Sequence, residues 1–110
     1  MTGGYDKTVR EILRRLRRGL QSIYGDRLKG VYLFGSYARR EAGEESDIDV
    51  LIVLDRVDRY SEEIEWTSEL VSDLSLSFGK SISRVFVSEK RWREENTMFF
   101  VNVRDEAVPA

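Results

Sequence analysis

The sequence predicts an α/β domain in which a mixed central sheet is flanked by helices. Two observations lead to this fold class. Segments with apolar residues at three- and four-residue steps alternate with short, nearly continuous apolar runs. The length, 110 residues, suits one domain (1–110) with its own core. The expected order is helix, strand, short helix, strand, helix, strand, helix.

The first half of the chain predicts one helix and two strands. Apolar side chains recur at helical spacing over about residues 6–24, with Asp6 as a cap and Gly25 as the stop. The run KGVYLFG predicts a short buried strand that ends at Gly35. A polar stretch with room for one or two helical turns follows. DIDVLIVL then predicts a strand that is apolar on both faces and therefore central in a sheet covered on both sides.

The second half continues the alternation. Residues 60–78 repeat the helical period and end before Gly79, a good helix stop. SISRVFV predicts a third strand, and Ser88 can cap a turn through RWREEN. The final stretch, MFFVNVRDEAV, fits a last helix that runs into a short extended end, although an all-strand interpretation fits nearly as well.

Composition excludes several classes of protein. With no cysteine and no histidine, the chain has no disulfide, no cysteine-based zinc site and no histidine acid–base chemistry. No apolar run approaches the roughly 18 residues of a membrane span, and the N-terminus has no signal-type segment. We expect a cytoplasmic protein that does not bind membranes. The net charge of −2 does not favour nucleic acid as a partner, although an arginine-rich face of the first helix keeps that alternative open.

Two aspartates open the most apolar strand. Asp47 and Asp49 are two residues apart, so in a strand both point to the same side, about 6–7 Å apart at the backbone. Hard cations such as magnesium prefer oxygen ligands and are often held by one or two carboxylates together with substrate phosphates. Taken alone, such a pair is more often two solvated residues at a strand end than a metal site.

A small-residue turn precedes this pair by ten residues. Gly35 permits close approach of backbone to a ligand, turn N–H groups can bind an anion, and Ser36 adds a hydroxyl. If the two strands are neighbours, phosphate donors and metal-binding carboxylates face one cleft. Phosphoryl-type transfer needs this combination, because the metal neutralises the charge of the phosphates while the backbone and serine position them.

The residues GSYAR, the ten residues between Ser36 and DID, and the run VLIVL together resemble the signature of minimal nucleotidyltransferase domains related to DNA polymerase beta. The resemblance covers about residues 28–87 and implies the small nucleotidyltransferase fold. It also implies an activity: a nucleoside monophosphate, such as AMP from ATP, moves to an acceptor with loss of pyrophosphate.

The resemblance assigns roles to five residues. It implies that Gly35 and Ser36 hold ATP or another nucleoside triphosphate, and that Asp47 and Asp49 are catalytic residues that bind two Mg²⁺ ions. Arg39 lies within GSYAR and is expected to contact the triphosphate, because guanidinium groups suit phosphate oxygens.

One expected acid is missing. Fully equipped members of the family carry a third carboxylate on the next strand, and SISRVFV contains none. Ser81 or Ser83 stands in its place, and a hydroxyl is a poor substitute for a carboxylate as a metal ligand. The alternative to an enzyme is therefore a catalytically reduced binding protein that neutralises its partner by forming a complex with it.

A domain of this size offers one wall of a cleft, so we expect a second copy or another protein to supply the other. Resemblance to small stand-alone members implies a HEPN-type toxin as that partner, with this chain as the antitoxin that adds AMP to the toxin or binds it.

Overall fold

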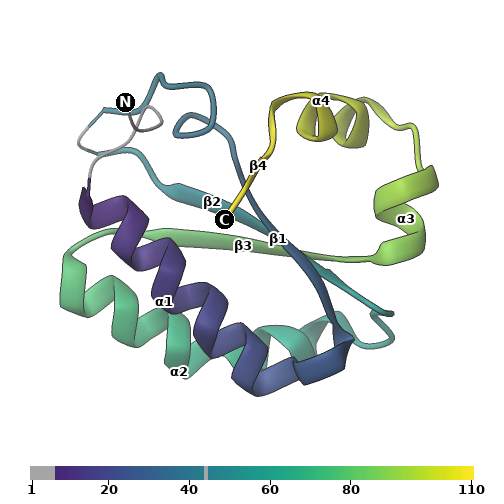
Figure 1. The fold of residues 1–110 in the computed structure, drawn as a ribbon, viewed down its shortest axis with the longest axis horizontal. Helices are drawn as coiled ribbons and strands as arrows, with labels where there is room; N and C mark the ends of the chain where they lie inside the picture. The colour runs from purple at the N-terminus through teal and green to yellow at the C-terminus, as the bar shows by residue number, and fades with distance from the viewer. Residues whose placement is uncertain (1–6, 44) are drawn as a thin grey trace.

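A computed structural model describes residues 7–43 and 45–110, so the predicted cap at Asp6 lies outside the described residues. Figure 1 shows the arrangement of the elements. In chain order they are α1 (Lys7–Tyr24), the 3₁₀ turn η1 (Gly25–Arg27), β1 (Leu28–Phe34), β2 (Ile48–Leu54), α2 (Tyr60–Phe78), β3 (Ile82–Ser88), α3 (Glu89–Glu94), α4 (Met98–Glu106) and β4 (Val108–Pro109).

The four strands form one mixed sheet in the order β3-β2-β1-β4. β1 pairs antiparallel with β2 and with β4, whereas β2 and β3 run parallel. β2 is thus an inner strand, and nearly all of its side chains are buried. This confirms the position predicted from its apolar residues on both faces.

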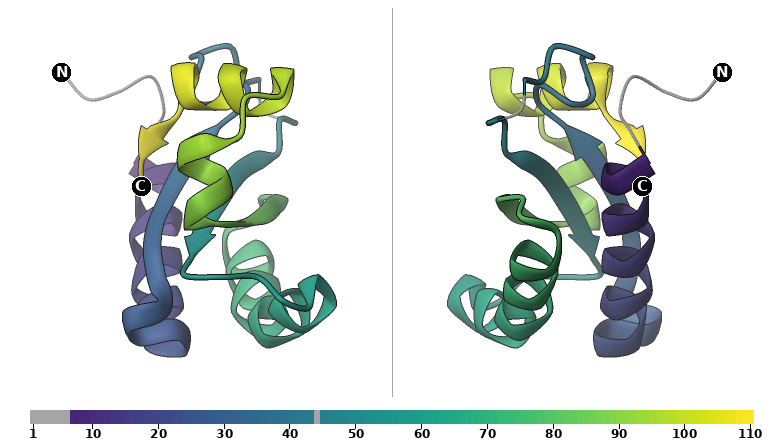
Figure 2. Two further views of the ribbon diagram at one scale, coloured as in Figure 1. Left: turned by 90° about the vertical axis from the view of Figure 1, so that its right-hand side faces the viewer. Right: turned by 90° about the vertical axis from the view of Figure 1, so that its left-hand side faces the viewer.

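Helices cover both faces of the sheet. α1 and α2 lie side by side on one face, and α3 and α4 lie on the other (Figures 1 and 2). Side chains alternate along β2, so Ile48, Val50, Ile52 and Leu54 join the larger core beneath α1 and α2. Leu51 and Val53 join a smaller cluster with Val87, Phe100 and Val103, beneath α3 and α4. None of the helices within the described ranges is both long and apolar enough to cross a membrane.

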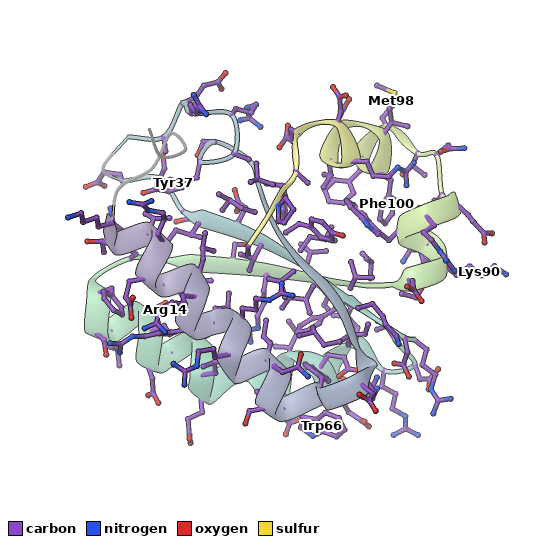
Figure 3. The ribbon with its side chains drawn as sticks, in the orientation of Figure 1. Arg14, Tyr37, Trp66, Lys90, Met98 and Phe100 are labelled. Carbon is purple, nitrogen blue, oxygen red and sulfur yellow. The ribbon has the colours of Figure 1, made fainter. Side chains whose placement is uncertain are left out.

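The final segment is a helix followed by a short strand, which resolves the ambiguity left by the sequence. The Thr97 side chain caps α4 by accepting a hydrogen bond from the backbone N–H of Phe100. Phe100 is buried against the sheet, whereas Met98 is exposed and points away from it (Figure 3). The Ser88 hydroxyl caps α3 as predicted, by accepting from the Arg91 N–H.

The prediction of a short helix between β1 and β2 is wrong. The chain makes hydrogen-bonded turns there instead, from Arg39 N to Gly35 O at 3.1 Å and from Glu41 N to Ser36 O at 2.9 Å. Arg40 has a φ of 61°, and this left-handed conformation interrupts right-handed helical geometry.

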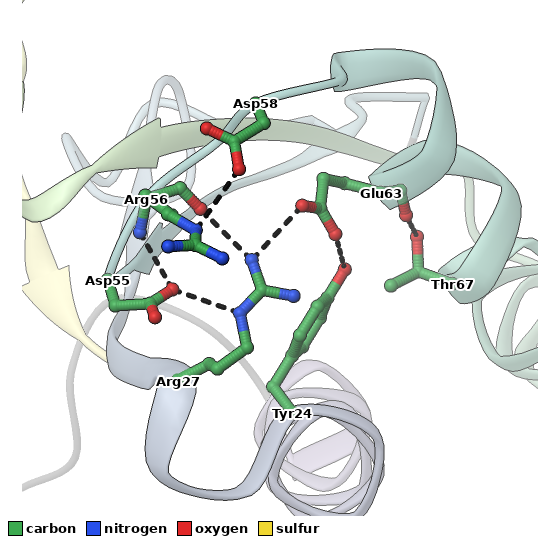
Figure 4. Close-up of polar contacts among 7 residues, drawn as sticks. All are labelled: Tyr24, Arg27, Asp55, Arg56, Asp58, Glu63 and Thr67. Atoms are coloured by element: carbon green, nitrogen blue, oxygen red, sulfur yellow. Dashed lines mark hydrogen bonds and ion pairs between the residues drawn. The ribbon is translucent and has the colours of Figure 1, made fainter.

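A polar network joins the end of α1 to α2 and to the residue after β2 (Figure 4). The Tyr24 hydroxyl donates to Glu63 at 2.9 Å, and the Arg27 guanidinium contacts Glu63 at 3.3 Å and Asp55 at 3.0 Å. Burial, together with the bond to Glu63, raises the pKa of Tyr24, so this hydroxyl keeps its proton and remains a donor. The buried Glu63 carboxylate is therefore fully compensated.

Replacing Glu63 by alanine is expected to lower the free energy of unfolding by about 2 kcal/mol, because Tyr24 and Arg27 lose a charged acceptor. Glu62→Ala is the matched control: it also lies in the first turn of α2, but its ion pair with Arg59 is exposed. The control should cost about 0.5 kcal/mol. Urea titration of both variants measures the difference, and equal losses would contradict a structural role for the network.

Candidate functional site

The pairing of β1 with β2 brings the predicted site residues together. Phe34, the last residue of β1, lies opposite Asp49 in the antiparallel register. The turn that starts at Gly35 therefore begins beside Asp49. The two strands are neighbours, as the sequence argument required, and the site lies where β1 ends and β2 begins.

Gly35 lies so close to Asp49 that a side chain at position 35 would require Asp49 to move. Gly35 has a φ of 77°, in the left-handed region that favours glycine. A Cβ at this position would collide with Asp49 Oδ2. The conformation and the close approach each favour glycine at this position.

Negative charge is concentrated at the start of β2. Asp47 is exposed and Asp49 is half-buried. Burial raises the pKa of Asp49, and the charge of Asp47 raises it further; Arg39 acts in the opposite direction, while Glu106 again raises it. A carboxylate that is partly desolvated beside other carboxylates favours a cation as partner.

The strand β3 places Ser83 next to this pair. In the parallel register Ser83 lies beside Asp49, so the two residues share the sheet face that α3 and α4 cover. Ser81 precedes the strand, and its carbonyl accepts from the Ile48 N–H at 2.9 Å. Within residues 7–43 and 45–110, no three histidine, cysteine, aspartate or glutamate side chains are grouped to hold a metal ion. Two carboxylates, Asp47 and Asp49, could hold a magnesium ion only if phosphates completed its ligands.

A glutamate that the sequence argument missed contacts the turn. The backbone N–H of Gly35 donates to Glu106 Oε2 at 2.7 Å, and Arg39 Nη1 lies 3.3 Å from both Glu106 carboxylate oxygens. Arg39 also donates through Nε to Glu41 at 3.0 Å. Glu106 ends α4, 71 residues beyond Gly35. No local spacing could indicate this contact, because only the packing of α4 on the sheet produces it.

Two further residues of the turn differ in exposure. Ser36 is half-buried, and its hydroxyl has no hydrogen-bond partner in the described part of the chain, so it can bind a ligand. The neighbouring Tyr37 is buried in the larger core, where its hydroxyl lies 3.4 Å from Lys80 Nζ. Tyr37 therefore packs and does not present its ring to a nucleotide base (Figure 3).

Comparison with known proteins adds three findings to this geometry. The model of the nucleotidyltransferase domain family matches residues 13–98. A Methanocaldococcus jannaschii protein named "Putative protein adenylyltransferase MJ0604" is 37% identical over 102 residues, which are 92% of this chain and 92% of that protein. That protein is one of eight curated M. jannaschii relatives that match, each of which is named a putative protein adenylyltransferase.

Two solved structures show the same fold. A crystal structure described as "a putative nucleotidyltransferase from Sulfolobus solfataricus" has a TM-score of 0.58 at 21% identity, covering 96% of this chain and 88% of that chain. A chain from the complex of a tri-AMPylated Shewanella oneidensis HEPN toxin with its MNT antitoxin has a TM-score of 0.54 at 20% identity, covering 91% and 69%.

Replacing Gly35 by alanine is expected to destabilise the protein more than the same change at Gly79. Both residues have positive φ, 77° and 65°, so both variants lose about 1–2 kcal/mol from backbone strain. Only at Gly35 does the new Cβ meet another group, Asp49 Oδ2; nothing lies within 4 Å of it at Gly79. Urea denaturation compares the two, and equal losses would show that the contact with Asp49 is relieved at no cost.

Replacing Asp49 by asparagine is expected to stabilise the fold slightly at pH 7, by at most about 1 kcal/mol, because solvent screens the charge of this half-buried group. The pKa of Asp49 is raised in the folded state, so its contribution to stability is complete below the unfolded pKa and is lost as pH rises through the folded pKa. At neutral pH the ionised carboxylate therefore costs stability that an amide does not.

Chemical denaturation without added metal, at pH 7, measures this effect. Asp73→Asn, exposed on α2, is the control and should stay within about 0.5 kcal/mol of the parent. A marked loss of stability in Asp49→Asn would mean that the folded protein favours the ionised carboxylate, opposite to the expected sign.

Proposed function

Because the chain belongs to the nucleotidyltransferase domain family, we propose that it binds ATP with magnesium and transfers AMP to an acceptor, releasing pyrophosphate. The observation that carries this proposal is the β1–β2 pairing, which sets the Gly35–Ser36 turn against Asp49. Phosphate donors and carboxylates then share one end of the sheet, the arrangement that nucleotidyl transfer needs.

Three groups of the turn are the proposed triphosphate ligands. The Gly35 N–H and the Ser36 hydroxyl can donate hydrogen bonds to phosphate oxygens, and the exposed Arg39 guanidinium can bind them as an ion pair. In the transfer, an acceptor oxygen bonds to the α-phosphorus while the bond between that phosphorus and the α–β bridging oxygen breaks. The electron pair leaves with pyrophosphate, and the proton of the acceptor O–H passes to solvent. The turn's contribution is to fix the phosphates so that this attack is in line.

Asp47 and Asp49 are the proposed magnesium ligands, since two neighbouring carboxylates at a strand start fit a cation that also binds phosphates. Bound magnesium would offset the negative charge that builds up on the leaving pyrophosphate. Asp49, beside Gly35, would hold the magnesium ion near the phosphate-binding turn. The exposed Asp47 would be the second ligand, on the solvent side.

The proposed acceptor is a protein. The related M. jannaschii protein carries a protein adenylyltransferase name, and a fold neighbour is found with a tri-AMPylated HEPN toxin and its MNT antitoxin. Asp47 and Arg39 are exposed, so a large acceptor can approach. We infer that the partner is a HEPN-type toxin and that this chain acts as its antitoxin; a second copy of the chain is the alternative partner.

One observation favours a second candidate function. The residue beside Asp49 on β3 is Ser83, where a third carboxylate is expected for full activity. A chain without that acid could still neutralise its partner by complex formation alone, with nucleotide or metal binding but no transfer.

Incubation with a HEPN-type toxin, magnesium and α-³²P-ATP is expected to label the toxin, whereas γ-³²P-ATP is not, because the γ-phosphate leaves in pyrophosphate. Asp49→Asn should reduce labelling roughly hundredfold or more, since it removes a proposed metal ligand. As this variant is expected to be at least as stable as the parent, the loss reports on chemistry. Asp73→Asn should label normally.

Neutralisation of the toxin separates the two candidate functions. If the parent does not label the toxin and the double variant Asp47→Asn with Asp49→Asn still binds and neutralises it, complex formation alone suffices and the second function is correct. Full labelling by Asp49→Asn would contradict the role proposed for that carboxylate.

A further inference from the structure

The carboxylate of Glu106 occupies the groups that the proposed function gives to the triphosphate. Its Oε2 accepts from the Gly35 N–H at 2.7 Å, and both oxygens lie 3.3 Å from Arg39 Nη1. The Glu106 side chain is 21% exposed. A glutamate carboxylate thus sits where a phosphate oxygen is expected, on one backbone donor and one guanidinium.

Carboxylate and phosphate compete for such donors because both are anions with oxygen acceptors. A hydrogen bond from a backbone N–H to a charged oxygen is about twice as strong as a neutral one. Among the described residues, Glu106 contacts the Gly35 N–H and Arg39 but not the hydroxyl of Ser36, the third proposed phosphate ligand. Of the three proposed ligands, the Gly35 N–H is therefore already occupied by the protein itself, and the Arg39 guanidinium is partly occupied.

The geometry argues against Glu106 as the missing third metal ligand in this state. Its carboxylate is directed at a backbone N–H and an arginine, both of which are donors. Together with Asp47 and Asp49 it does not form a three-ligand group in the part of the chain that the structure describes. Its present contacts are those of an anion held by donors.

Glu106 is placed so that its carboxylate can leave without disrupting the fold. It is the last residue of α4, and the chain after it is extended at Ala107. Rotation about its own side-chain bonds moves the carboxylate away from the turn. α4 itself stays capped at Thr97 and anchored through Phe100 and Val103.

We propose that Glu106 is an internal competitor of the nucleotide: it holds the Gly35 amide and Arg39 in the free protein and must be displaced before a triphosphate binds. This inference rests on the proposed function of the same site. Its consequence is that the apparent affinity for nucleotide is lowered by the fraction of molecules in which Glu106 is bound to the turn. Glu106 therefore sets the nucleotide concentration at which the site fills.

The test is the dissociation constant of ATP, measured by calorimetry on the full chain with and without magnesium. Glu106→Gln is expected to bind ATP about tenfold more tightly than the parent in both conditions, because a charged hydrogen bond no longer opposes binding. Glu106→Ala should do the same, which excludes an effect of the new amide.

Glu41→Gln is the matched control. It removes one negative charge and one partner of Arg39, as Glu106→Gln does, but it has no contact with Gly35. We expect it to tighten ATP binding by no more than about threefold. Equal gains in the two variants would overturn the proposal, because general charge removal would then explain both.

A second readout addresses the contact itself. The Gly35 amide proton resonance of the ¹⁵N-labelled protein should move upfield in Glu106→Gln, because the charged acceptor is lost. In the ATP-saturated parent it should move only slightly, because phosphate replaces carboxylate as the charged acceptor. An unchanged Gly35 resonance in Glu106→Gln would overturn the contact.

The remaining outcomes separate this inference from the proposed function. If Glu106→Gln binds ATP as the parent does, Glu106 is no competitor, and the proposed function stands. If Glu106→Gln binds ATP more weakly only with magnesium present, Glu106 is a metal ligand and the proposal is wrong. If neither the parent nor any variant binds ATP, the proposed function fails and the competitor role fails with it.

Discussion

The contact between Gly35 and Asp49 is the constraint on which the site depends. A turn backbone can lie against that carboxylate only where the residue has no Cβ and adopts positive φ, and glycine meets both conditions. The antiparallel register fixes the approach, because Phe34 and Asp49 face each other across β1 and β2. Asp49 is therefore positioned by paired strands of the core, and the turn with the proposed phosphate donors starts directly from the end of β1.

This arrangement opposes stability. Burial of Asp49 beside Asp47 works against its ionised form, and the backbone N–H of the adjacent Gly35 donates to Glu106 instead. The fold tolerates the cost because its larger core lies on the opposite face of the sheet, under α1 and α2. At the far end of β2, the network around Glu63 compensates another buried charge completely. The charge at the site is the exception.

The sequence predicts those parts that local patterns determine. DIDVLIVL is apolar on both faces, and β2 is indeed an inner strand. Periodicity could not foresee the left-handed Arg40, which turns the expected short helix into separate turns. It could not choose helix over strand for the last segment either, where the Thr97 cap and the burial of Phe100 decide. Glu106 reaches Gly35 only through the packing of α4, so no spacing in the sequence indicates it.

The unequal cores on the two faces of the sheet have a consequence for the order in which the molecule opens. The cluster under α3 and α4 is the smaller of the two, and β4 joins the end of that layer to β1 through a short pairing with Tyr32 and Leu33. Segments with few buried apolar contacts open at lower free energy than the core does. Backbone amides of α4 are therefore expected to exchange with solvent before those of α1, which makes the element bearing Glu106 part of the least protected cooperative unit.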